Sequence, residues 1–570
     1  MKRHLEGLLQ QAIVDASKGG ELKSTSLPPL IVEVPKDAAF GDLATPIAMG
    51  LARAERRAPR DVAQTLVAHL RDPEGWLEAT EIAGPGYLNF RFSPRFWKRC
   101  LRDLEADDQL VPRLTKGERI LVEFVSGNPT GPLHVGHGRG AVTGDVVARL
   151  LEASGHEVKR EYYINDAGRQ IEMLGRSVVT RLRQYLGEDI ELPEGAYPGE
   201  YLVDLVRERA DDLLRAIAKQ LDSPVPPTRD GQRQLLASNS EAAVAASASA
   251  AAAMMMDRIR ADLDLCGIHF DNFVSERRLR AEGAIDAALA DLEKAGLLYS
   301  EEGARWFRST RYGDDKDRVV ERANGELTYF ASDIGYHRDK LKRGFHRLIN
   351  IWGADHHGHI ARVKAAIEAL GDPPDALTVL LVQIVHLTRS GAPVRMGKRS
   401  GEFVALREIV EEVGSDAARF FFLLRKSDSQ LEFDLDLAKK QGSDNPVFYV
   451  QYVHARCCSL FRQAQAAGLE VPAAEDVDFG KLSSPEEIAL IKQLALFPDA
   501  IADAAADLEP HRIVFHLIDL AGCFHRFYNQ HRILGEEPAV SRARFYLVHV
   551  VRQTVRRGLE LLGVRAPEAM

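Results

Sequence analysis

Hydrophobic residues near the beginning of the chain recur at every third or fourth position, as on one face of an amphipathic helix. This spacing runs from Leu5 to Ile13. The predicted elements that follow are a strand at Leu30–Val34, helices at Ala44–Ala54 and Val62–Leu70, and an alternating strand at Tyr87–Phe92. Turn-forming residues near position 114 end the pattern, so residues 1–114 are expected to form a small N-terminal α+β domain.

The next stretch has the pattern of a strand–helix–strand unit. Ile120–Val125 is an apolar run typical of a buried strand, and residues 126–132 (SGNPTGP) predict a tight turn. A helix with an apolar face is expected from about His137 to Ala153, followed by a strand at Glu157–Ile164. This order is the building block of a Rossmann-type parallel sheet.

An interruption of the sheet is predicted from about 185 to 310. It contains the alanine-rich run Ala243–Met256, which strongly favours a helix. Alternation of helices and strands resumes near Thr328. The later predicted elements are a helix after Asp333, strands at Leu348–Trp352 and Leu377–His386, and between them a helix at Ile360–Leu370.

The pattern becomes wholly helical after about Asp436 and stays so to the end, with Phe448, Tyr452 and Ala455 at helical spacing. The predicted fold is therefore multidomain α/β. A small α+β domain (1–114) precedes a Rossmann-type parallel-sheet domain with an insertion (115–436), and an all-α domain (437–570) follows.

Composition agrees with a soluble globular protein, since 45% of the 570 residues are hydrophobic and 28% are charged. The formal net charge is −9, so any contact with a nucleic acid must come from local basic surface. Residues 511–570 offer such a surface, with nine Arg and no Lys against five acidic residues. A helical surface that merely happens to be rich in Arg is an equally simple explanation.

The five cysteines form no C-x-x-C pair, which speaks against a disulfide framework or a cysteine zinc site and suits a reducing cytosol. The first residues lead into a helical pattern, and no run of about 18 apolar residues follows. We therefore expect a cytoplasmic protein without a membrane segment or a secretion signal.

The first candidate chemical motif is His134–Val135–Gly136–His137, between the turn and the predicted helix. A helix N-terminus directs unpaired N–H groups and a positive dipole end toward a phosphate. Two imidazoles three residues apart can reach the same phosphate, and glycine at 136 lets a nucleotide lie against backbone. A glycine-rich turn with two incidental histidines is the simpler alternative.

This motif resembles the "HIGH" box of the class I aminoacyl-tRNA synthetases. Their second box, "KMSKS", follows the last strand of the sheet, where this chain has the related segment 395–401 (RMGKRSG). Arg395 replaces the first lysine of that box, and Lys398 keeps the second. A basic loop there would neutralise the charge of departing pyrophosphate. Taken alone, the segment is explained most simply as a basic loop exposed to solvent.

Within this class the chain most resembles the arginyl-tRNA synthetases, nearly from end to end. The matching segments are Glu123–Phe124–Val125–Ser126–x–Asn128–Pro129–Thr130–Gly131–Pro132–Leu133–His134, Asp257–x8–Cys266–Gly267–Ile268–x–Phe270–Asp271–x3–Ser275–Glu276, Thr328–Tyr329–x3–Asp333, Phe40–Gly41–Asp42, Asp416–Ala417–Ala418–Arg419 and the closing residues Leu561–Met570. No one motif is decisive, but together they occur in the family's order.

The resemblance implies an arginine site. A guanidinium is a planar, permanently charged fork of donors that calls for carboxylates at fixed places. By resemblance, Asp333 and Tyr329 would hold this group, and Glu123 and Asn128 would lie near the α-amino and carboxylate end. His356 would stand where the family often has Gln.

The resemblance also implies ATP, L-arginine and tRNA(Arg) as ligands. His134, His137 and Lys398 would be catalytic, and Mg²⁺ would accompany the nucleotide. The implied ATP-binding residues are Gly136, Gly353, Asp355, Met396 and Lys398. The helical domain would bind the anticodon and the N-terminal domain the tRNA elbow; the implied tRNA contacts are Asn89, Phe92, Tyr449 and Met570. We expect a monomer.

Several alternatives stay open at this point. Another class I synthetase, such as a cysteinyl or methionyl enzyme, would usually have cysteine-based zinc ligands. A different nucleotidyltransferase would not need the long helical domain, and an inactive paralogue could serve as an RNA-binding scaffold. Asp355, His356, His357 and His359 are potential metal ligands, but neighbouring residues on a strand face opposite sides, so no metal site is expected.

Overall fold

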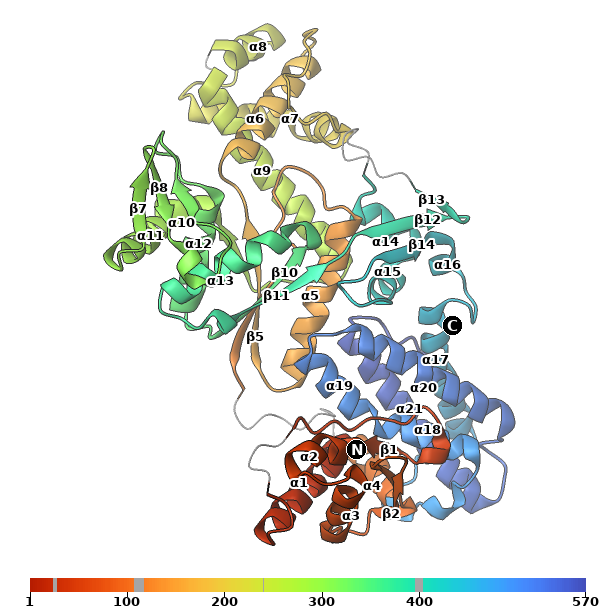
Figure 1. Cartoon of the computed structure of the whole chain (residues 1–570). Coiled ribbons are helices and arrows are strands. Elements are labelled where there is room, and N and C mark those ends of the chain that lie inside the picture. Colours follow the sequence, from red (N-terminus) through yellow and green to blue (C-terminus); the bar gives the residue numbers. More distant parts are fainter. Residues whose placement is uncertain (24–27, 107–116, 239, 395–402) are drawn as a thin grey trace.

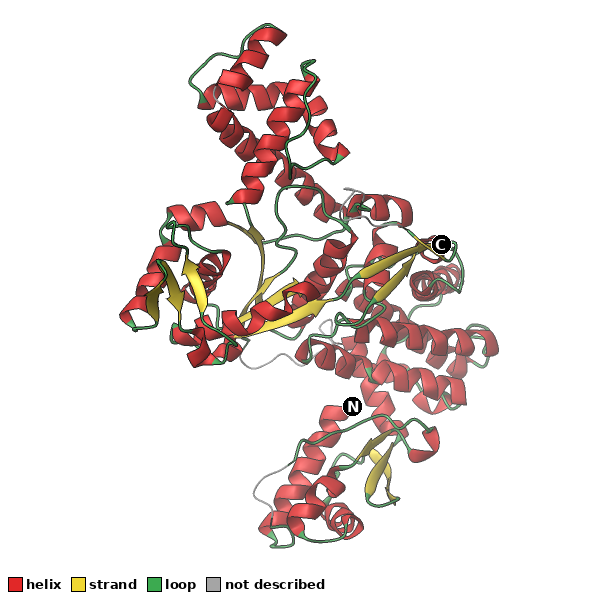
Figure 2. Ribbon diagram, turned by 45° about the horizontal axis from the view of Figure 1, so that its top comes forward, coloured by secondary structure: helices red, strands yellow, loops and turns green. Residues whose placement is uncertain are grey.

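The computed structural model describes residues 1–23, 28–106, 117–238, 240–394 and 403–570, which form an N-terminal domain, a central α/β domain and a C-terminal helical domain (Figure 1). Figure 2 shows the strands gathered mainly in the central domain, with helices on both sides. Among the described helices, none is both long enough and apolar enough to span a bilayer.

The N-terminal domain packs helices against a small antiparallel sheet of order β1-β3-β2. Its elements are α1 (Lys2–Lys18), β1 (Leu43–Thr45), α2 (Ile47–Glu55), α3 (Pro59–His69), β2 (Leu77–Ala83), β3 (Tyr87–Phe92) and α4 (Pro94–Ala106). The predicted strand Tyr87–Phe92 is confirmed residue for residue. The predicted strand Leu30–Val34 is wrong, because that segment makes only an isolated bridge between Glu33 and Ala44.

The central domain is built on a five-stranded parallel sheet of order β11-β10-β4-β5-β6. The strands are β4 (Arg119–Glu123), β5 (Glu157–Ile164), β6 (Asn272–Ser275), β10 (Arg347–Gly353) and β11 (Leu377–Val382). The chain builds outward from β4 in one direction and then returns to its other side with β10. In such sheets the crevice for ligands lies at the carboxyl ends of the strands where the order reverses.

Helices cover both faces of this sheet. They are α5 (Val135–Ala153), α10 (Glu276–Ala281), α11 (Ala284–Lys294), α12 (Tyr329–Lys342) and α13 (Ile360–Ala369). Ile120 and Val122 of β4 belong to the hydrophobic cluster that contains α5, whereas Leu121 belongs to the cluster that contains α11, α12 and α13. The alternation follows from the two-residue period of a strand and explains why the three central residues of β4 are all apolar.

The insertion rises from the sheet as four helices, α6 (Arg169–Tyr185), α7 (Glu200–Gln220), α8 (Arg229–Ser238) and α9 (Ser240–Leu265) (Figure 1). The alanine-rich run lies in α9, as predicted. The segment expected to interrupt the sheet also supplies its edge strand, β6, which was not predicted. A separate antiparallel sheet follows, formed by β7 (Leu298–Glu301), β8 (Ala304–Phe307) and β9 (Arg318–Glu321).

A second small sheet joins the central domain to the helices after it. Its elements and neighbours are β12 (Val385–Arg389), β13 (Ala392–Pro393), α14 (Leu406–Val413), α15 (Ser415–Phe422), β14 (Leu431–Asp434) and α16 (Leu435–Lys439). The single strand predicted at Leu377–His386 is therefore two strands, β11 and β12, which belong to different sheets.

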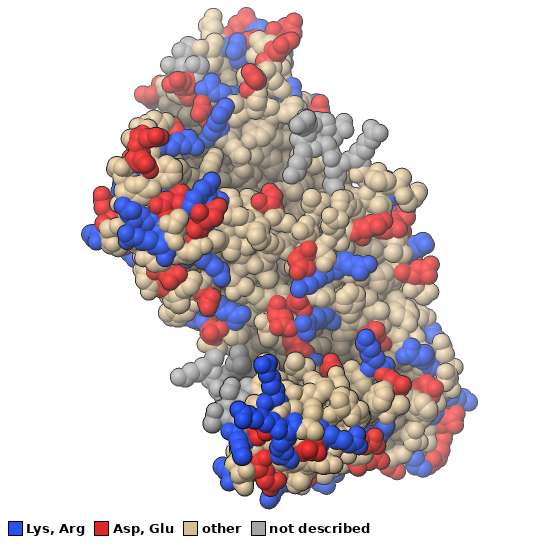
Figure 3. Space-filling view, viewed as in Figure 1, with Lys and Arg blue, Asp and Glu red and all other residues tan. Residues whose placement is uncertain are grey.

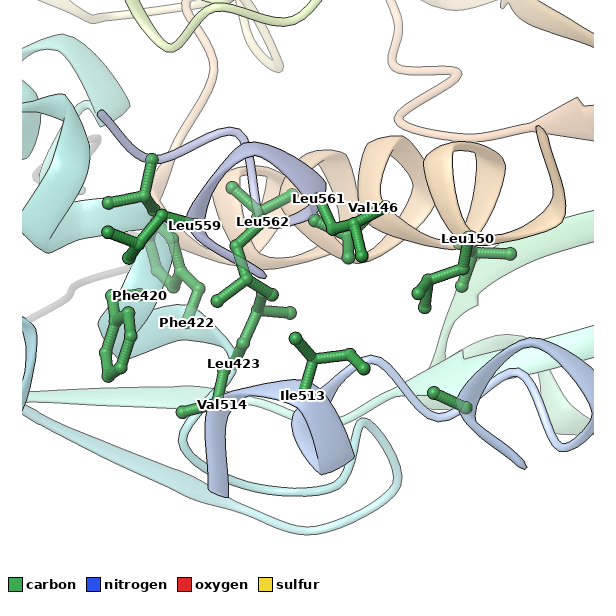
Figure 4. Close-up of a cluster of buried hydrophobic side chains, with 14 of the residues drawn as sticks. Val146, Leu150, Phe420, Phe422, Leu423, Ile513, Val514, Leu559, Leu561 and Leu562 are labelled. Atoms are coloured by element: carbon green, nitrogen blue, oxygen red, sulfur yellow. The ribbon is translucent and has the colours of Figure 1, made fainter. Parts of the chain in front are cut away.

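The C-terminal domain is all-α, as predicted, and consists of α17 (Pro446–Ala466), α18 (Pro485–Ala495), α19 (Phe497–Ala506), α20 (His511–Gln530) and α21 (Pro538–Leu561). It packs against the far end of α5, where Val146 and Leu150 meet apolar side chains of α15, α20 and α21 (Figure 4). The N-terminal domain docks on the same helical domain: the Lys492 ammonium lies 2.5 Å from Asp42, and the Tyr546 hydroxyl donates to Glu105 at 2.8 Å.

Candidate functional site

Several residues predicted to act in catalysis or ligand binding lie at the carboxyl edge of the parallel sheet. Glu123 is the last residue of β4, and it pairs in register with Asn350 of the neighbouring strand β10. His134 immediately precedes α5, and β10 ends at Gly353. The reversal point of the sheet thus lies between β4 and β10, where the fold favours a ligand site.

The two histidines of the first motif are held by backbone groups. The backbone N–H of His134 donates to Nδ1 of His137 at 3.2 Å, and the backbone N–H of Gly136 donates to Nδ1 of His134 at 3.1 Å. The rings stack with centroids 3.7 Å apart. Since each Nδ1 accepts a hydrogen bond, the proton of each neutral ring lies on Nε2.

This corner suits an anion. Burial, followed by the neighbouring His134, lowers the pKa of His137 to about 3, so His137 is a neutral donor at physiological pH. The positive end of the α5 dipole also lies at this corner, although the first N–H groups of the helix are already bonded within the protein. At Gly136 a Cβ would lie 2.9 Å from Cε1 of His134, so the glycine is needed for the imidazole to keep its place.

The turn before α5 has a strained backbone that several contacts fix. Val125 and Ser126 have φ of 67° and 40°, in a region that a β-branched residue rarely adopts. The Ser126 hydroxyl donates to Glu123 at 2.8 Å, and the hydroxyl of Tyr162 accepts from the Gly127 N–H at 3.1 Å. Strain of this kind persists only where its surroundings determine it, as at functional sites.

Three carboxylates gather beside this turn. Glu123 and Glu276 are buried and already paired: Glu123 with Lys340, and Glu276 with Arg280, each at 2.5 Å. Within the described part of the chain, the half-buried carboxylate of Asp333 has no such partner. Burial, followed by Glu123 and then Glu276, raises the pKa of Asp333 to about 7. A cationic ligand would relieve this repulsion, so the arrangement suits a guanidinium or an ammonium.

Two of the three remaining predicted arginine contacts, Tyr329 and Asn128, lie on elements beside this acidic pocket, which is defined by the carboxylates of Glu123, Glu276 and Asp333. Tyr329, the first residue of α12, is 51% exposed. Its hydroxyl would be 3.8 Å from a Cβ at Gly168, across the pocket. The side-chain amide of Asn128 donates to Gln170 of α6. The strained turn, α12 and the start of α6 therefore enclose one site.

The loop after β10 is open to solvent. Gly353, Asp355 and His356 are all exposed, and within the described ranges the contacts of His356 are local: Asp355 at 3.8 Å, and the Trp352 and His359 rings at centroid distances of 6.5 and 5.5 Å. The structure therefore does not bring His356 to Asp333. Among the described residues, no three His, Cys, Asp or Glu side chains are grouped to hold a metal ion.

Met396 and Lys398 of the second predicted box lie outside the described residues. The segment directly after that box is described, and it pairs with the first box. The N–H of Val135 donates to the Val404 carbonyl at 3.3 Å, and the N–H of Leu406 donates to the Leu133 carbonyl at 2.7 Å. These bonds bring the downstream flank of the second box beside His134.

The predicted tRNA residues have different surroundings. Tyr449 lines a cavity of about 620 Å³ between α17 and α20, together with Tyr452, Arg456, His525 and Tyr528. Phe524 and Phe527, two further aromatic residues of α20, are buried in the core. Met570, at the end of the chain, is 51% exposed.

Asn89 and Phe92, the other predicted tRNA contacts, belong to β3 of the N-terminal domain. Both side chains are buried in the N-terminal domain, and the Phe92 ring stacks on Phe96 with centroids 4.1 Å apart. Alternation along β3 placed them in a strand, but it did not reveal that both side chains are buried. Their burial argues against direct contacts with tRNA.

Sequence reasoning missed three buried polar residues of the site, His337, Lys340 and Asn350. Asp333, His337 and Lys340 lie on one face of α12, since they are spaced by four and three residues. A polar stripe at helical spacing next to a predicted binding residue was the signal that could have found them.

Comparison with known proteins decides the family. The chain is 47% identical to the "Arginine--tRNA ligase" of Syntrophotalea carbinolica and 49% identical to that of Desulfosudis oleivorans, and each comparison covers both chains completely. The chain belongs to the arginyl-tRNA synthetase family. Models for the arginyl tRNA synthetase N terminal domain, the class I (R) catalytic domain and the DALR anticodon binding domain match residues 3–92, 101–221 with 228–429, and 450–570, respectively.

Solved structures support the same family. Thermus thermophilus arginyl-tRNA synthetase is 25% identical over the whole of both chains, with a TM-score of 0.77. Methionyl-tRNA synthetase of Mycobacterium tuberculosis covers 78% of the chain at 12% identity with a TM-score of 0.55, and this likeness shows the fold alone. Arginyl-tRNA synthetases are therefore favoured over another class I synthetase.

Proposed function

We propose that the protein joins L-arginine to tRNA(Arg) at the expense of ATP, through an arginyl-adenylate. The observation that supports this most directly is the juxtaposition of two sites on one sheet edge. The imidazole corner at the start of α5 suits phosphates, and the acidic pocket around Asp333 suits a cation. A reaction between ATP and a cationic amino acid needs both.

In the first step, the arginine carboxylate attacks the α-phosphate of ATP and pyrophosphate leaves. No protein nucleophile is required, so the residues contribute positioning and charge stabilisation. Nε2–H of His134 and of His137 would donate to the phosphates as negative charge builds up there. Lys398 would neutralise the leaving pyrophosphate, and Mg²⁺ would enter with the nucleotide.

The other ATP contacts would be Gly136, Gly353, Asp355 and Met396. The position of Gly353 and Asp355 at the end of β10 supports a role near the ribose.

The arginine side chain would be held by Asp333 and Tyr329, with Glu123 and Asn128 near its α-amino and carboxylate groups. The exposed His356 would contribute only if its loop closes over the ligand. In the second step, a ribose hydroxyl at the end of the tRNA attacks the carbonyl of the adenylate, and AMP leaves.

For tRNA binding, we propose residues 437–570 as the anticodon-binding domain, with Tyr449 and Met570 among its contacts, and residues 1–114 as the domain for the tRNA elbow. The cavity beside Tyr449 offers aromatic and Arg side chains for base stacking and phosphate contacts. Figure 3 shows Lys and Arg gathered on one face of the N-terminal domain, which is a surface of the kind that RNA requires. We further propose that the protein is a cytoplasmic monomer.

The test is charging of total tRNA with each of the twenty labelled amino acids. Arginine alone should be attached, and ATP–pyrophosphate exchange with tRNA present should respond to arginine only. Asp333→Ala should abolish use of arginine while binding of ATP persists. Charging with another amino acid, or unchanged kinetics for arginine in Asp333→Ala, would contradict the proposal.

A further inference from the structure

A buried lysine lies beneath the acidic pocket. Lys340 of α12 is 0% exposed. Its ammonium lies 2.5 Å from Oε2 of Glu123 and donates to Oδ1 of Asn350 at 3.2 Å, and the ring of Tyr336 is 4.2 Å away. A fully buried ammonium is costly unless it is paired and hydrogen-bonded, so these partners account for its burial.

The hydrogen bonds beyond Lys340 have only one direction that satisfies every donor. Oδ1 of Asn350 accepts the hydrogen bond from Lys340, so the NH₂ group of Asn350 donates to Nε2 of His337 at 3.1 Å. The remaining ring nitrogen, Nδ1, then bears the proton and donates to the backbone carbonyl of Asp333 at 2.8 Å. His337 is neutral in this arrangement, because burial, followed by Lys340, lowers its pKa to about 3.

We propose that Lys340 is a positioning residue for arginine, which fixes Glu123 directly and the backbone of Asp333 through Asn350 and His337. The inference rests on the proposed function. Lys340 binds Oε2 of Glu123 at the end of β4, and its relay ends on the turn of α12 that presents Asp333. The two acids thus share one buried anchor, although 210 residues separate them in the sequence.

The three acids differ in whether a side chain of the protein already neutralises them. Glu276 is held by Arg280 and by the Ser332 hydroxyl, which donates at 2.8 Å, and Glu123 is held by Lys340 and Ser126. Asp333 is thereby left as the carboxylate whose partner must come from the ligand. A pocket with two internally neutralised acids and one unpaired acid matches a ligand of single positive charge.

The experiment measures ATP–pyrophosphate exchange by the full-length protein with tRNA present. Lys340→Met should raise the KM for arginine on the order of tenfold or more, since a charge-assisted hydrogen bond is lost. The KM for ATP should change less than about twofold. Lys342→Met is the matched control, because Lys342 is exposed on the same helix, and its KM for arginine should equal that of the parent protein.

A mutant cycle with Glu123→Gln separates positioning from a merely structural role. If Lys340 acts through Glu123, adding Lys340→Met to Glu123→Gln should raise the KM for arginine far less than it does in the parent protein. The double variant also removes both buried charges together, so it guards against a single variant that does not fold.

The outcomes are distinct. Additive effects in the cycle, an unchanged KM for arginine in Lys340→Met, or tighter arginine binding, which would mean that Lys340 competes with the ligand for Glu123, would each overturn the inference. Failure of the proposed function is visible separately, because the parent protein would then not respond to arginine at all.

Discussion

The two ends of α5 have different kinds of support although they belong to one helix. The first turn is held by backbone N–H groups that donate to imidazoles, and by a glycine that leaves room for a ring. The far half is held by apolar side chains from the C-terminal domain (Figure 4). The buried pair of Asp145 with Arg419 also holds it. One end is arranged for an incoming ligand, and the other end joins two domains.

The comparison shows where the chain keeps polar groups for a ligand and where it satisfies them within the protein. In the first turn, the hydrogen bond to Nδ1 of His137 leaves the ring proton on Nε2, where it can donate to a ligand. At the far end the polar groups are saturated: Arg419 donates to Asp145, to the Leu562 carbonyl at 2.8 Å and to the Cys266 carbonyl at 3.0 Å. Substitutions at the far end should therefore change stability, and those at the first turn should change turnover.

The largest effect is expected for Arg419→Leu. It leaves the Asp145 carboxylate buried without its main partner, so the free energy of unfolding should fall by about 3–5 kcal/mol. The measurement is urea denaturation followed by circular dichroism. Arg149→Leu is the control, because its contact with Asp145 is partly exposed and should be worth less than about 1 kcal/mol. Equal losses in the two variants would show that Arg419 is not the anchor of this junction.

A somewhat smaller effect, on turnover, is expected for His137→Ala. Loss of a preorganised donor should lower kcat by about 10²–10³-fold while the urea midpoint stays close to that of the parent protein. His137→Gln, whose amide can supply an N–H near the position of Nε2, should recover part of the rate in the same exchange assay. If the Gln and Ala variants are equally slow, the donor is not what His137 contributes.

Leu150→Ala should destabilise the junction by about 2–4 kcal/mol, because Leu150 is fully buried and its truncation leaves a cavity. The KM for arginine should not change. The half-exposed Leu469 provides the control, since Leu469→Ala should alter stability by less than about 0.5 kcal/mol. A rise in the KM for arginine in Leu150→Ala would mean that the two ends of α5 are not separable.

The smallest expected effect is a pH dependence at the ligand end. Asp333 has a pKa of about 7 in the free pocket, and a guanidinium pairs with the ionised carboxylate. Arginine should therefore bind progressively more weakly as the pH falls below 7, with a Kd about tenfold higher at pH 6 than at pH 8. Calorimetric titration measures this, and the slope should vanish in Asp333→Asn. A flat profile in the parent protein would contradict the raised pKa.

The parallel core could largely be predicted from the sequence, because β4, β10 and β11 are largely apolar and are bounded by turn residues. Glu157–Ile164 is confirmed residue for residue, and β4 and β10 differ from prediction by one or two positions at each end. The edge strand β6 could not be predicted, since four residues at a sheet edge show no clear period. Leu30–Val34 has strand-like composition, but prolines on both sides leave it only a single bridge.

The candidate site was predictable to the extent that it follows from motifs. The motifs name Glu123, His134, His137 and Asp333, and the structure places all four on one sheet edge. The motifs do not reveal the buried polar residues that hold these four side chains in place. Lys340 near the end of a helix has the appearance of a solvated cation, and only tertiary packing against Glu123 of β4 shows that it is buried.

The contact between the first and the last domains has a consequence for synthesis on the ribosome. Lys2 pairs with Asp503 at 2.8 Å, and Asp42 pairs with Lys492. The N-terminal domain, which ends with α4 at Ala106, therefore finds its docking surface only after some 390 further residues have been translated. During that interval its docking face is exposed to solvent and to chaperones. The nascent chain should therefore gain protection against protease late and in one step, when α18 and α19 leave the exit tunnel.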